Sequence, residues 1–258
     1  MLKGKPMKLG LRIKVIGATE AVASVALAGM LMSSPRGRAD DSSDDDDRDP
    51  RIEQGFDIAQ SQMIKLTFDE NDRKLRNLVG LGSYIVNTEG CNDCHSAGPM
   101  TQYAPGGNPF FGQKKQINLK TYLGGGRDFG KVSGPPSPDI ISRNLTPTPK
   151  TGLPGGDITL DRFRKIFSDG TDFDHLHPHC SASITTNCFP PPSMTPPIPP
   201  VDGDLLQVMP WPNFKDLLDH DKCAIYEYLK AVPCIQGNYP GAGGPGAGIP
   251  PEPADRCQ

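Results

Sequence analysis

Residues 90–95 read Gly-Cys-Asn-Asp-Cys-His, and this stretch carries the most specific chemical signal in the chain. Two cysteines three residues apart lie on one helical turn, so both thiols can reach the same partner molecule. The imidazole of His95 follows the second cysteine directly. We expect the segment to come at the end of a helix that Asn71 or Asp72 caps and that runs to about Asn87.

The pattern Cys-x-x-Cys-His is the attachment signature of c-type haem. In that chemistry Cys91 and Cys94 form thioether bonds to the two vinyl groups of one porphyrin, and His95 becomes an axial ligand of the iron. A redox dithiol of the thioredoxin type would need a βαβ setting, and a zinc site would need a second Cys-x-x-Cys pair. The sequence offers neither. The motif therefore predicts one covalently bound haem c.

The periodic segments of the sequence predict an all-α class. Thr159 is expected to cap a helix over residues 160–168 that Gly170 ends, and Asp219 to cap a last helix that ends at Ala231. Apolar residues recur at helical spacing along the last helix, and no segment alternates in the manner of a half-buried strand.

Two glycines, Gly80 and Gly82, interrupt the helix that precedes the cysteine motif. Glycines inside a helix indicate that another backbone passes close by. We expect the last helix to be that partner, with Tyr228 and Leu229 packed against one of the two glycines.

The motifs around residues 90–95 resemble those of class I bacterial cytochromes c, in particular small monohaem proteins and the haem domains of alcohol and gluconate dehydrogenase cytochrome subunits. The resemblance implies a cytochrome c fold, with a few short helices around one haem, long Gly/Pro-rich loops and disordered termini. It implies an electron-transfer protein, not an enzyme, with the iron held by histidine and methionine. It covers about residues 70–235 and rests on segments in the family's order: 82–86, 91–95, 144–147, 151–155, 168–172, 208–211 and 224–229.

The second axial ligand is expected to be Met209, since the resemblance places the distal methionine shortly before the closing helix. Pro210 follows it and stiffens the chain, and Trp211 can shield a haem edge. The other methionines beyond the first 39 residues, Met63, Met100 and Met194, are less suited by position, and any methionine can simply fill a core.

Charged and imidazole side chains supply further candidates for the site. Arg143 and Arg127 are candidates to tune the potential near the haem propionates, although an exposed arginine is more often a solubilising charge. His175, His177 and His179 could replace methionine as a ligand or bind adventitious metal, and they are most often solvent-exposed in such a loop.

Composition excludes several classes of protein. The chain is 258 residues long with 29 glycines and 28 prolines, and only 36% of its residues are hydrophobic, which disfavours a doubly wound α/β enzyme. Its formal net charge of −3 disfavours a nucleic-acid partner. The partners expected are redox proteins, a donor and an acceptor, with association to a membrane complex as a further option.

The ends of the chain predict export and little structure. Residues 1–39 have a basic start, an apolar run and small residues at 37 and 39, as in a cleaved signal peptide, with an uncleaved anchor as the alternative. Export places the protein in the periplasm or another extracytoplasmic space. We expect an acidic disordered arm and lead-in over 40–69, a cytochrome c domain over 70–235 with a proline-rich insert at about 175–200, and a Gly/Pro-rich tail over 236–258.

The other five of the seven cysteines favour disulfides in an exported protein. Cys180–Cys188 would pin the insert and Cys234–Cys257 would fasten the tail, but spacing alone leaves other pairings open. Cys223 is then left over, and an odd thiol could also bridge to a partner.

Three functions stay open at this point. The chain can be an exported one-electron carrier, a permanently docked haem subunit of a larger dehydrogenase, oxidase or electron-transfer complex, or a haem enzyme or gas sensor with an open iron. A well-placed Met209 separates the third from the first two, because it leaves no open coordination position.

Overall fold

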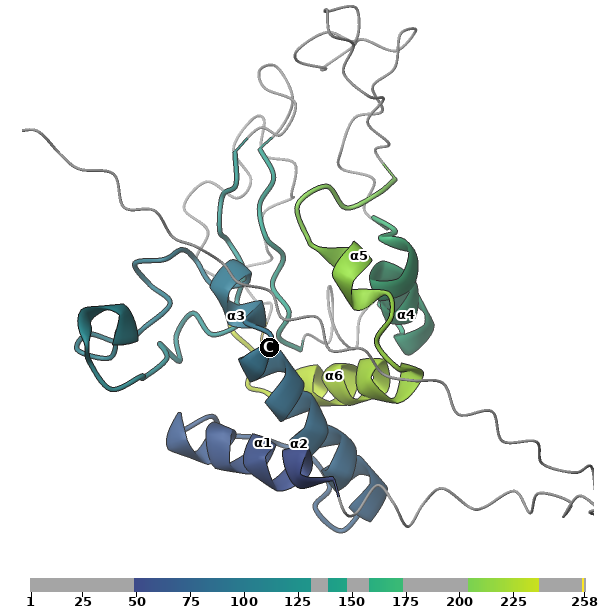
Figure 1. The fold of residues 1–258 in the computed structure, drawn as a ribbon, viewed down its shortest axis with the longest axis horizontal. Coiled ribbons are helices and arrows are strands. Elements are labelled where there is room, and N and C mark those ends of the chain that lie inside the picture. Colours follow the sequence, from purple (N-terminus) through teal and green to yellow (C-terminus); the bar gives the residue numbers. More distant parts are fainter. Residues whose placement is uncertain (1–48, 131–138, 148–157, 174–203, 237–256, 258) are drawn as a thin grey trace, which may run out of the picture. The chain divides into compact units, whose positions relative to one another are not determined.

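The computed structural model describes residues 49–130, 139–147, 158–173, 204–236 and 257. Within these ranges the chain is helical and contains no strand, in agreement with the all-α class; isolated bridges join Tyr103 to Ile117, Asp128 to Ile141 and Thr171 to Leu205. The elements in chain order (Figure 1) are α1 (Pro50–Ser61), α2 (Arg73–Thr88), α3 (Cys91–Cys94), the 3-10 helix η2 (Pro109–Phe111), α4 (Leu160–Asp169), α5 (Trp211–Phe214) and α6 (Asp219–Ala231).

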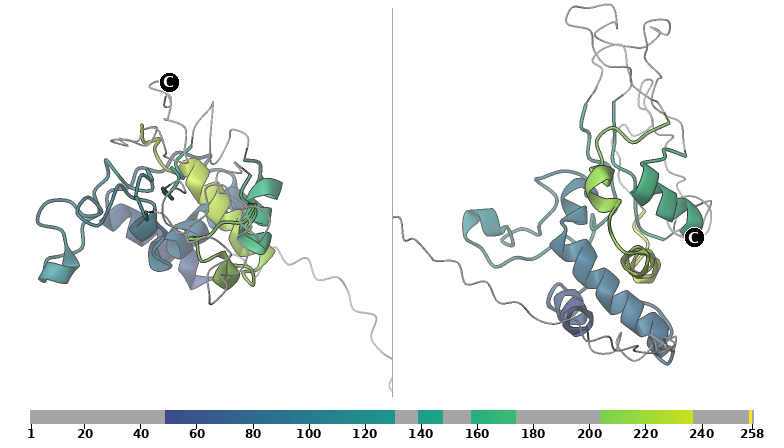
Figure 2. Two further views of the ribbon diagram at one scale, coloured as in Figure 1. Left: turned by 90° about the horizontal axis from the view of Figure 1, so that it is seen from above. Right: turned by 45° about the vertical axis from the view of Figure 1, so that its right-hand side comes forward.

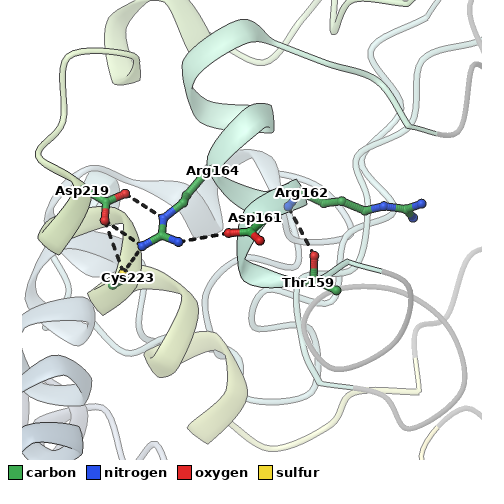
Figure 3. Close-up of polar contacts among 6 residues, drawn as sticks. All are labelled: Thr159, Asp161, Arg162, Arg164, Asp219 and Cys223. Atoms are coloured by element: carbon green, nitrogen blue, oxygen red, sulfur yellow. Dashed lines mark hydrogen bonds and ion pairs between the residues drawn. The ribbon is translucent and has the colours of Figure 1, made fainter.

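Two of the expected helix caps are confirmed. The Asp72 carboxylate accepts a hydrogen bond from the backbone N–H of Leu75 at 3.0 Å and so begins α2. The Thr159 hydroxyl accepts from the N–H of Arg162 at 3.4 Å at the start of α4 (Figure 3), and Gly170 ends that helix with a φ of 71°.

The expected cap of the last helix is wrong. Leu218 occupies the cap position of α6, and Asp219 is the first residue inside the helix. Its carboxylate accepts two hydrogen bonds of 2.7 Å from the guanidinium of Arg164 on α4, as Figure 3 shows. An acidic side chain in the first turn still complements the helix dipole, so the sequence signal located the helix but not the contact that this side chain makes.

Helix α2 lies between two helices, and its glycines face different neighbours (Figures 1 and 2). A Cβ on Gly82 would collide with the carbonyl of Ala224 and come within 2.7 Å of the Tyr228 Cβ, so the predicted packing of α6 at this glycine is confirmed for Tyr228. A Cβ on Gly80 would come within 2.7 Å of the Ile52 carbonyl oxygen on α1. Residues two apart on a helix point in different directions, and therefore Gly82 contacts α6 whereas Gly80 contacts α1.

Helix α1 lies in the segment expected to be a disordered arm and lead-in, so residues 50–61 are packed helix and not disordered. Asp49 accepts from the N–H of Arg51 at 2.9 Å, and Pro50 occupies the first turn, where a missing N–H costs nothing. The helix packs closely on α2, where the buried Ser83 hydroxyl donates to the carbonyl of Gly55 at 2.7 Å.

Several expectations concern residues outside the described ranges. These are the signal segment 1–39, nearly all of the acidic run, the insert at 175–200 and most of the tail 236–258. Among the residues that the structure does describe, none of the helices has the length and apolar character needed to cross a bilayer.

Candidate functional site

The cysteine motif forms a short helical turn at the end of α2. Gly90 has a φ of 72°, a conformation that glycine adopts without strain, and it turns the chain from α2 into α3. The N–H of His95 donates to the carbonyl of Cys91 at 2.9 Å and closes the turn. Cys91 and Cys94 are both free thiols on this one turn.

His95 is held by a single backbone carbonyl. Its Nδ1 lies 2.7 Å from the carbonyl oxygen of Arg143. A carbonyl oxygen only accepts, so Nδ1 carries the proton and Nε2 keeps its lone pair. Burial lowers the pKa of His95 and favours this neutral form. An oriented neutral imidazole with Nε2 available is the donor that a haem iron takes, and the residues present therefore fit the group.

The main chain at Gly125 passes close to Arg143, whose carbonyl contacts His95. Gly125 has a φ of 69°, and its Cα lies so close to the main chain of Arg143 and Asn144 that any side chain would collide. The N–H of Gly125 in turn donates to the carbonyl of His95 at 2.8 Å. The glycine run at 124–126 is therefore needed for a close approach of two backbones at the imidazole.

The side chain of Arg143 reaches in another direction. Its Nη2 lies 2.7 Å from the Oδ1 of Asp172, whose side chain is buried. The N–H of Asp172 donates to the carbonyl of Asp204 at 2.8 Å. Arg143 thus connects His95, through its main chain, to the segment that leads to Met209, through its side chain. Its expected role near the haem propionates stays a prediction, and the guanidinium has this carboxylate as a partner.

The segment with Met209 is fixed against the end of α4. The N–H of Leu206 donates to the carbonyl of Gly170 at 2.8 Å, and the indole N–H of Trp211 donates back to the carbonyl of Leu206 at 3.1 Å. Gly170 leaves room for the Trp211 ring, which a Cβ there would strike. Met209 is partly buried and packs against the hydrophobic core.

The other candidates differ in their surroundings. Met100 is 89% exposed and Met63 is 56% exposed, so neither is embedded in the core as Met209 is. Met194 lies outside the described ranges, as do His175, His177 and His179. Arg127 donates from Nη1 to the carbonyl of Asp93 at 2.7 Å, which places it on the cysteine turn itself.

The thiol of Cys91 is poorly suited to dithiol exchange. Burial, with the nearby carboxylate of Glu89 as a smaller cause, raises the pKa of Cys91 to about 12. Exchange reactions need a thiolate, which enzymes obtain by lowering the pKa of the attacking cysteine. The environment of Cys91 therefore differs from that of a reactive thioredoxin-type thiol.

A closed hydrogen-bond cycle holds the end of α2 just before the cysteine turn. The Tyr122 hydroxyl donates to the Asn87 side-chain oxygen at 2.9 Å, the Asn87 amide donates to the Tyr228 hydroxyl at 3.3 Å, and the two hydroxyls are 2.9 Å apart. Burial raises the pKa of both tyrosines, so they stay protonated. The cycle joins α2, α6 and the 121–125 segment at one point.

The predicted disulfide between Cys234 and Cys257 is present, with the two Cα atoms 5.7 Å apart. Cys223 is a free thiol, as expected for the cysteine left over. Cys180 and Cys188 lie outside the described ranges. In the part of the chain that can be described, no three His, Cys, Asp or Glu side chains gather into a metal-binding group.

Sequence reasoning missed three residues that position the site. Asn92 accepts from the N–H of Leu123 at 2.9 Å, Gly125 makes room for Arg143, and Asp172 pairs with it. The triple glycine was a usable signal of close approach, whereas contacts of Asn92 and Asp172 with residues some 30 positions away leave no local pattern.

Comparisons of the chain with protein-family models, with curated proteins and with solved structures find no match.

Proposed function

We propose that the chain binds one haem covalently through Cys91 and Cys94, with His95 and Met209 as axial ligands, and that it transfers single electrons. The observation that carries this proposal is the hydrogen bond from His95 Nδ1 to the Arg143 carbonyl. It leaves Nε2 as a neutral donor on the residue that directly follows two free thiols on one helical turn.

The residues of the chain set the conditions for that chemistry. Bound haem supplies a one-electron Fe(III)/Fe(II) couple. The Arg143 carbonyl increases the electron density on the His95 imidazole, and Met209 as the second ligand would favour the reduced form. The unpaired state of both thiols leaves them available for attachment, and the raised pKa of Cys91 disfavours dithiol exchange.

Met209 decides between an electron carrier and an open-site haem enzyme or sensor. Its segment is fixed by Gly170 and Trp211, and the side chain lies against the core instead of in solvent. A sulfur held there as the second ligand would exclude exogenous ligands from bound haem, and this supports electron transfer.

The compartment and partners belong to the same proposal. The Cys234–Cys257 disulfide supports an oxidising, extracytoplasmic location, together with the predicted signal segment. The partners are a donor and an acceptor protein, in free exchange or in one complex with this chain.

Covalent attachment is tested by acid–acetone extraction of the purified protein. Haem should stay with the wild-type polypeptide and be lost, or never attached, in Cys94→Ala. Cys223→Ser is the matched control, because it removes a free thiol elsewhere and should retain haem. Haem extracted freely from the wild type would contradict the proposal.

The sixth ligand is tested with Met209→Ala and with Met100→Ala as the exposed control. Oxidised wild type and the control should show the weak long-wavelength band of a His/Met haem, and Met209→Ala should lose it and bind carbon monoxide. A band that persists in Met209→Ala would point to another methionine, and a wild type that lacks the band would point to a histidine at 175, 177 or 179.

A further inference from the structure

A long loop between the cysteine turn and the 121–125 segment presents apolar side chains to solvent. Its two arms run antiparallel: the N–H of Ala104 donates to the carbonyl of Gln116 at 2.9 Å, and that of Asn118 donates to the carbonyl of Gln102 at 3.0 Å. Between the arms lies η2, at the outer end of the loop (Figures 1 and 2). We call residues 101–121 the η2 loop.

The outer end of the η2 loop is held in one shape. Asn108 accepts from the N–H of Phe110 at 3.0 Å, and its own N–H donates to the Gln113 side chain at 2.9 Å. Gly112 closes the turn with a φ of 73°. Phe110 and Phe111 are nevertheless 83% and 74% exposed. Two adjacent phenylalanines held in solvent indicate a contact surface. Their exposure is unfavourable, and a partner that buried them would lower the free energy of the system.

The base of the η2 loop is attached to the helical core. Gln62, at the end of α1, accepts from the N–H of Ile117 at 2.9 Å and donates to the carbonyl of Lys115 at 3.3 Å. Gln102 donates to the carboxylate of Asp93 in the cysteine turn. The loop therefore projects the phenylalanines from a fixed base.

The charge around the phenylalanines has one sign. No aspartate or glutamate occurs between Asp93 and Asp128, in a chain whose net charge is −3. Lys114, Lys115 and Lys120 lie in the η2 loop and are exposed. This part of the molecule is thus positive and apolar together, and it complements a surface that is negative and apolar together.

We propose that the η2 loop docks on an anionic phospholipid bilayer, with Phe110 and Phe111 entering the interfacial region and Lys114 and Lys115, which follow them in the loop, contacting lipid phosphates. Exposed aromatic residues beside long basic side chains are the combination that binds reversibly at membrane interfaces. A projecting end with two apolar side chains suits insertion into a soft surface better than the broad, packed face of a stable protein interface. This proposal does not depend on the proposed haem chemistry.

The test is sedimentation of the protein purified from the cell envelope with vesicles of phosphatidylcholine alone and with vesicles containing one-third phosphatidylglycerol. Wild type should bind the anionic vesicles and lose binding in high salt. Lys114→Gln/Lys115→Gln should weaken binding about thirty-fold, and Phe110→Ser/Phe111→Ser about a hundred-fold.

Matched controls change the same residue types elsewhere. Leu218→Ser removes another exposed apolar side chain, and Lys74→Gln/Lys165→Gln removes two exposed lysines from helices; both should bind as wild type does. Circular dichroism checks that every variant is folded.

Three results would overturn the proposal: no vesicle binding by wild type, binding that the lysine pair affects but the phenylalanine pair does not, or a vesicle-independent dimer that Phe110→Ser/Phe111→Ser dissociates. The last would assign the surface to a second copy of the chain.

Discussion

Arg143 shows how one residue serves two contacts through different atoms. Its carbonyl orients His95, and its guanidinium pairs with the buried Asp172. A substitution at 143 can therefore keep the imidazole contact while it removes the ion pair, because every amino acid has the carbonyl. The sequence marked Arg143 as a candidate for its charge, and the backbone role could not be predicted because it depends on Gly125, 18 positions away in the chain.

A single methyl group added at Gly82 or at Gly80 should disturb only one of the two helix contacts of α2 and so test each contact by itself. Gly82→Ala pushes against Ala224 and Tyr228 on α6, and Gly80→Ala against Ile52 on α1. Each should lower the free energy of unfolding by about 1–3 kcal/mol through overpacking. Urea denaturation measures it, with Lys74→Ala on the exposed face of α2 as the control. Unchanged stability in both glycine variants would mean that these helices do not meet as described.

Asp49 should make the start of α1 sensitive to acid. Its hydrogen bonds with the Arg51 side chain hold the pKa of Asp49 below the ordinary value of about 3.9. A lowered folded-state pKa gives stability that is present above the ordinary value and is lost as the pH falls through the folded one. Asp49→Asn should weaken this acid dependence, and Asp49→Ala should cost about 1 kcal/mol at neutral pH.

The check is denaturation as a function of pH, monitored by helix content. Asp57→Asn, at an exposed position of the same helix, is the control and should keep the acid dependence of wild type. An Asp49→Asn profile identical to wild type would show that the Asp49 carboxylate does not contribute to the acid dependence of stability.

At the scale of elements, the predicted helices near residues 71–87, 160–168 and 219–231 correspond to α2, α4 and α6. Strong periodicity and flanking caps made these segments predictable. Helix α1 was missed because the dense run of aspartates before it suggested disorder, although Asp49 followed by Pro50 is a recognisable helix start. The η2 loop could not be predicted, since its shape rests on backbone pairing between distant arms.

The ion pair between Arg143 and Asp172 should couple the His95 side of the site to the Met209 segment. Arg143→Leu leaves the Asp172 carboxylate buried without its charged partner, and the free energy of unfolding should fall by about 3 kcal/mol. Arg143→Leu/Asp172→Leu should lose less than the sum of the two single changes. A double-mutant cycle in urea measures this coupling, and additive losses would show that the pair is not energetically linked.

At the scale of the whole molecule, the Cys234–Cys257 disulfide fastens the last described residue to the chain just after α6. That chain is itself held: the N–H of Ile235 donates to the Thr146 hydroxyl at 2.9 Å, and its carbonyl accepts from Asn144 at 2.9 Å. This pairing was one that the sequence suggested without fixing the connectivity, and the structure has the bond and a free Cys223.

Cys257→Ser should therefore lower the free energy of unfolding by about 3 kcal/mol, because it releases a loop with a sequence separation of 23 residues in the unfolded chain. Cys223→Ser is the control and should leave stability nearly unchanged. Thermal unfolding with and without a reductant measures both. A reductant effect that persists in Cys257→Ser would point to another bond as its source.

The contact between α2 and α6 joins residues that are far apart in the chain: Asn87 and Tyr228 are separated by 141 positions. Pairing at such a distance forms late, since most of the polypeptide must be present before the last helix can dock. Until then the end of α2, which leads into the turn with Cys91 and Cys94, lacks the Tyr228 hydroxyl that completes its hydrogen-bond cycle. Variants that slow the docking of α6 would therefore lengthen the time during which the end of α2 next to the cysteine turn is not yet held by the last helix.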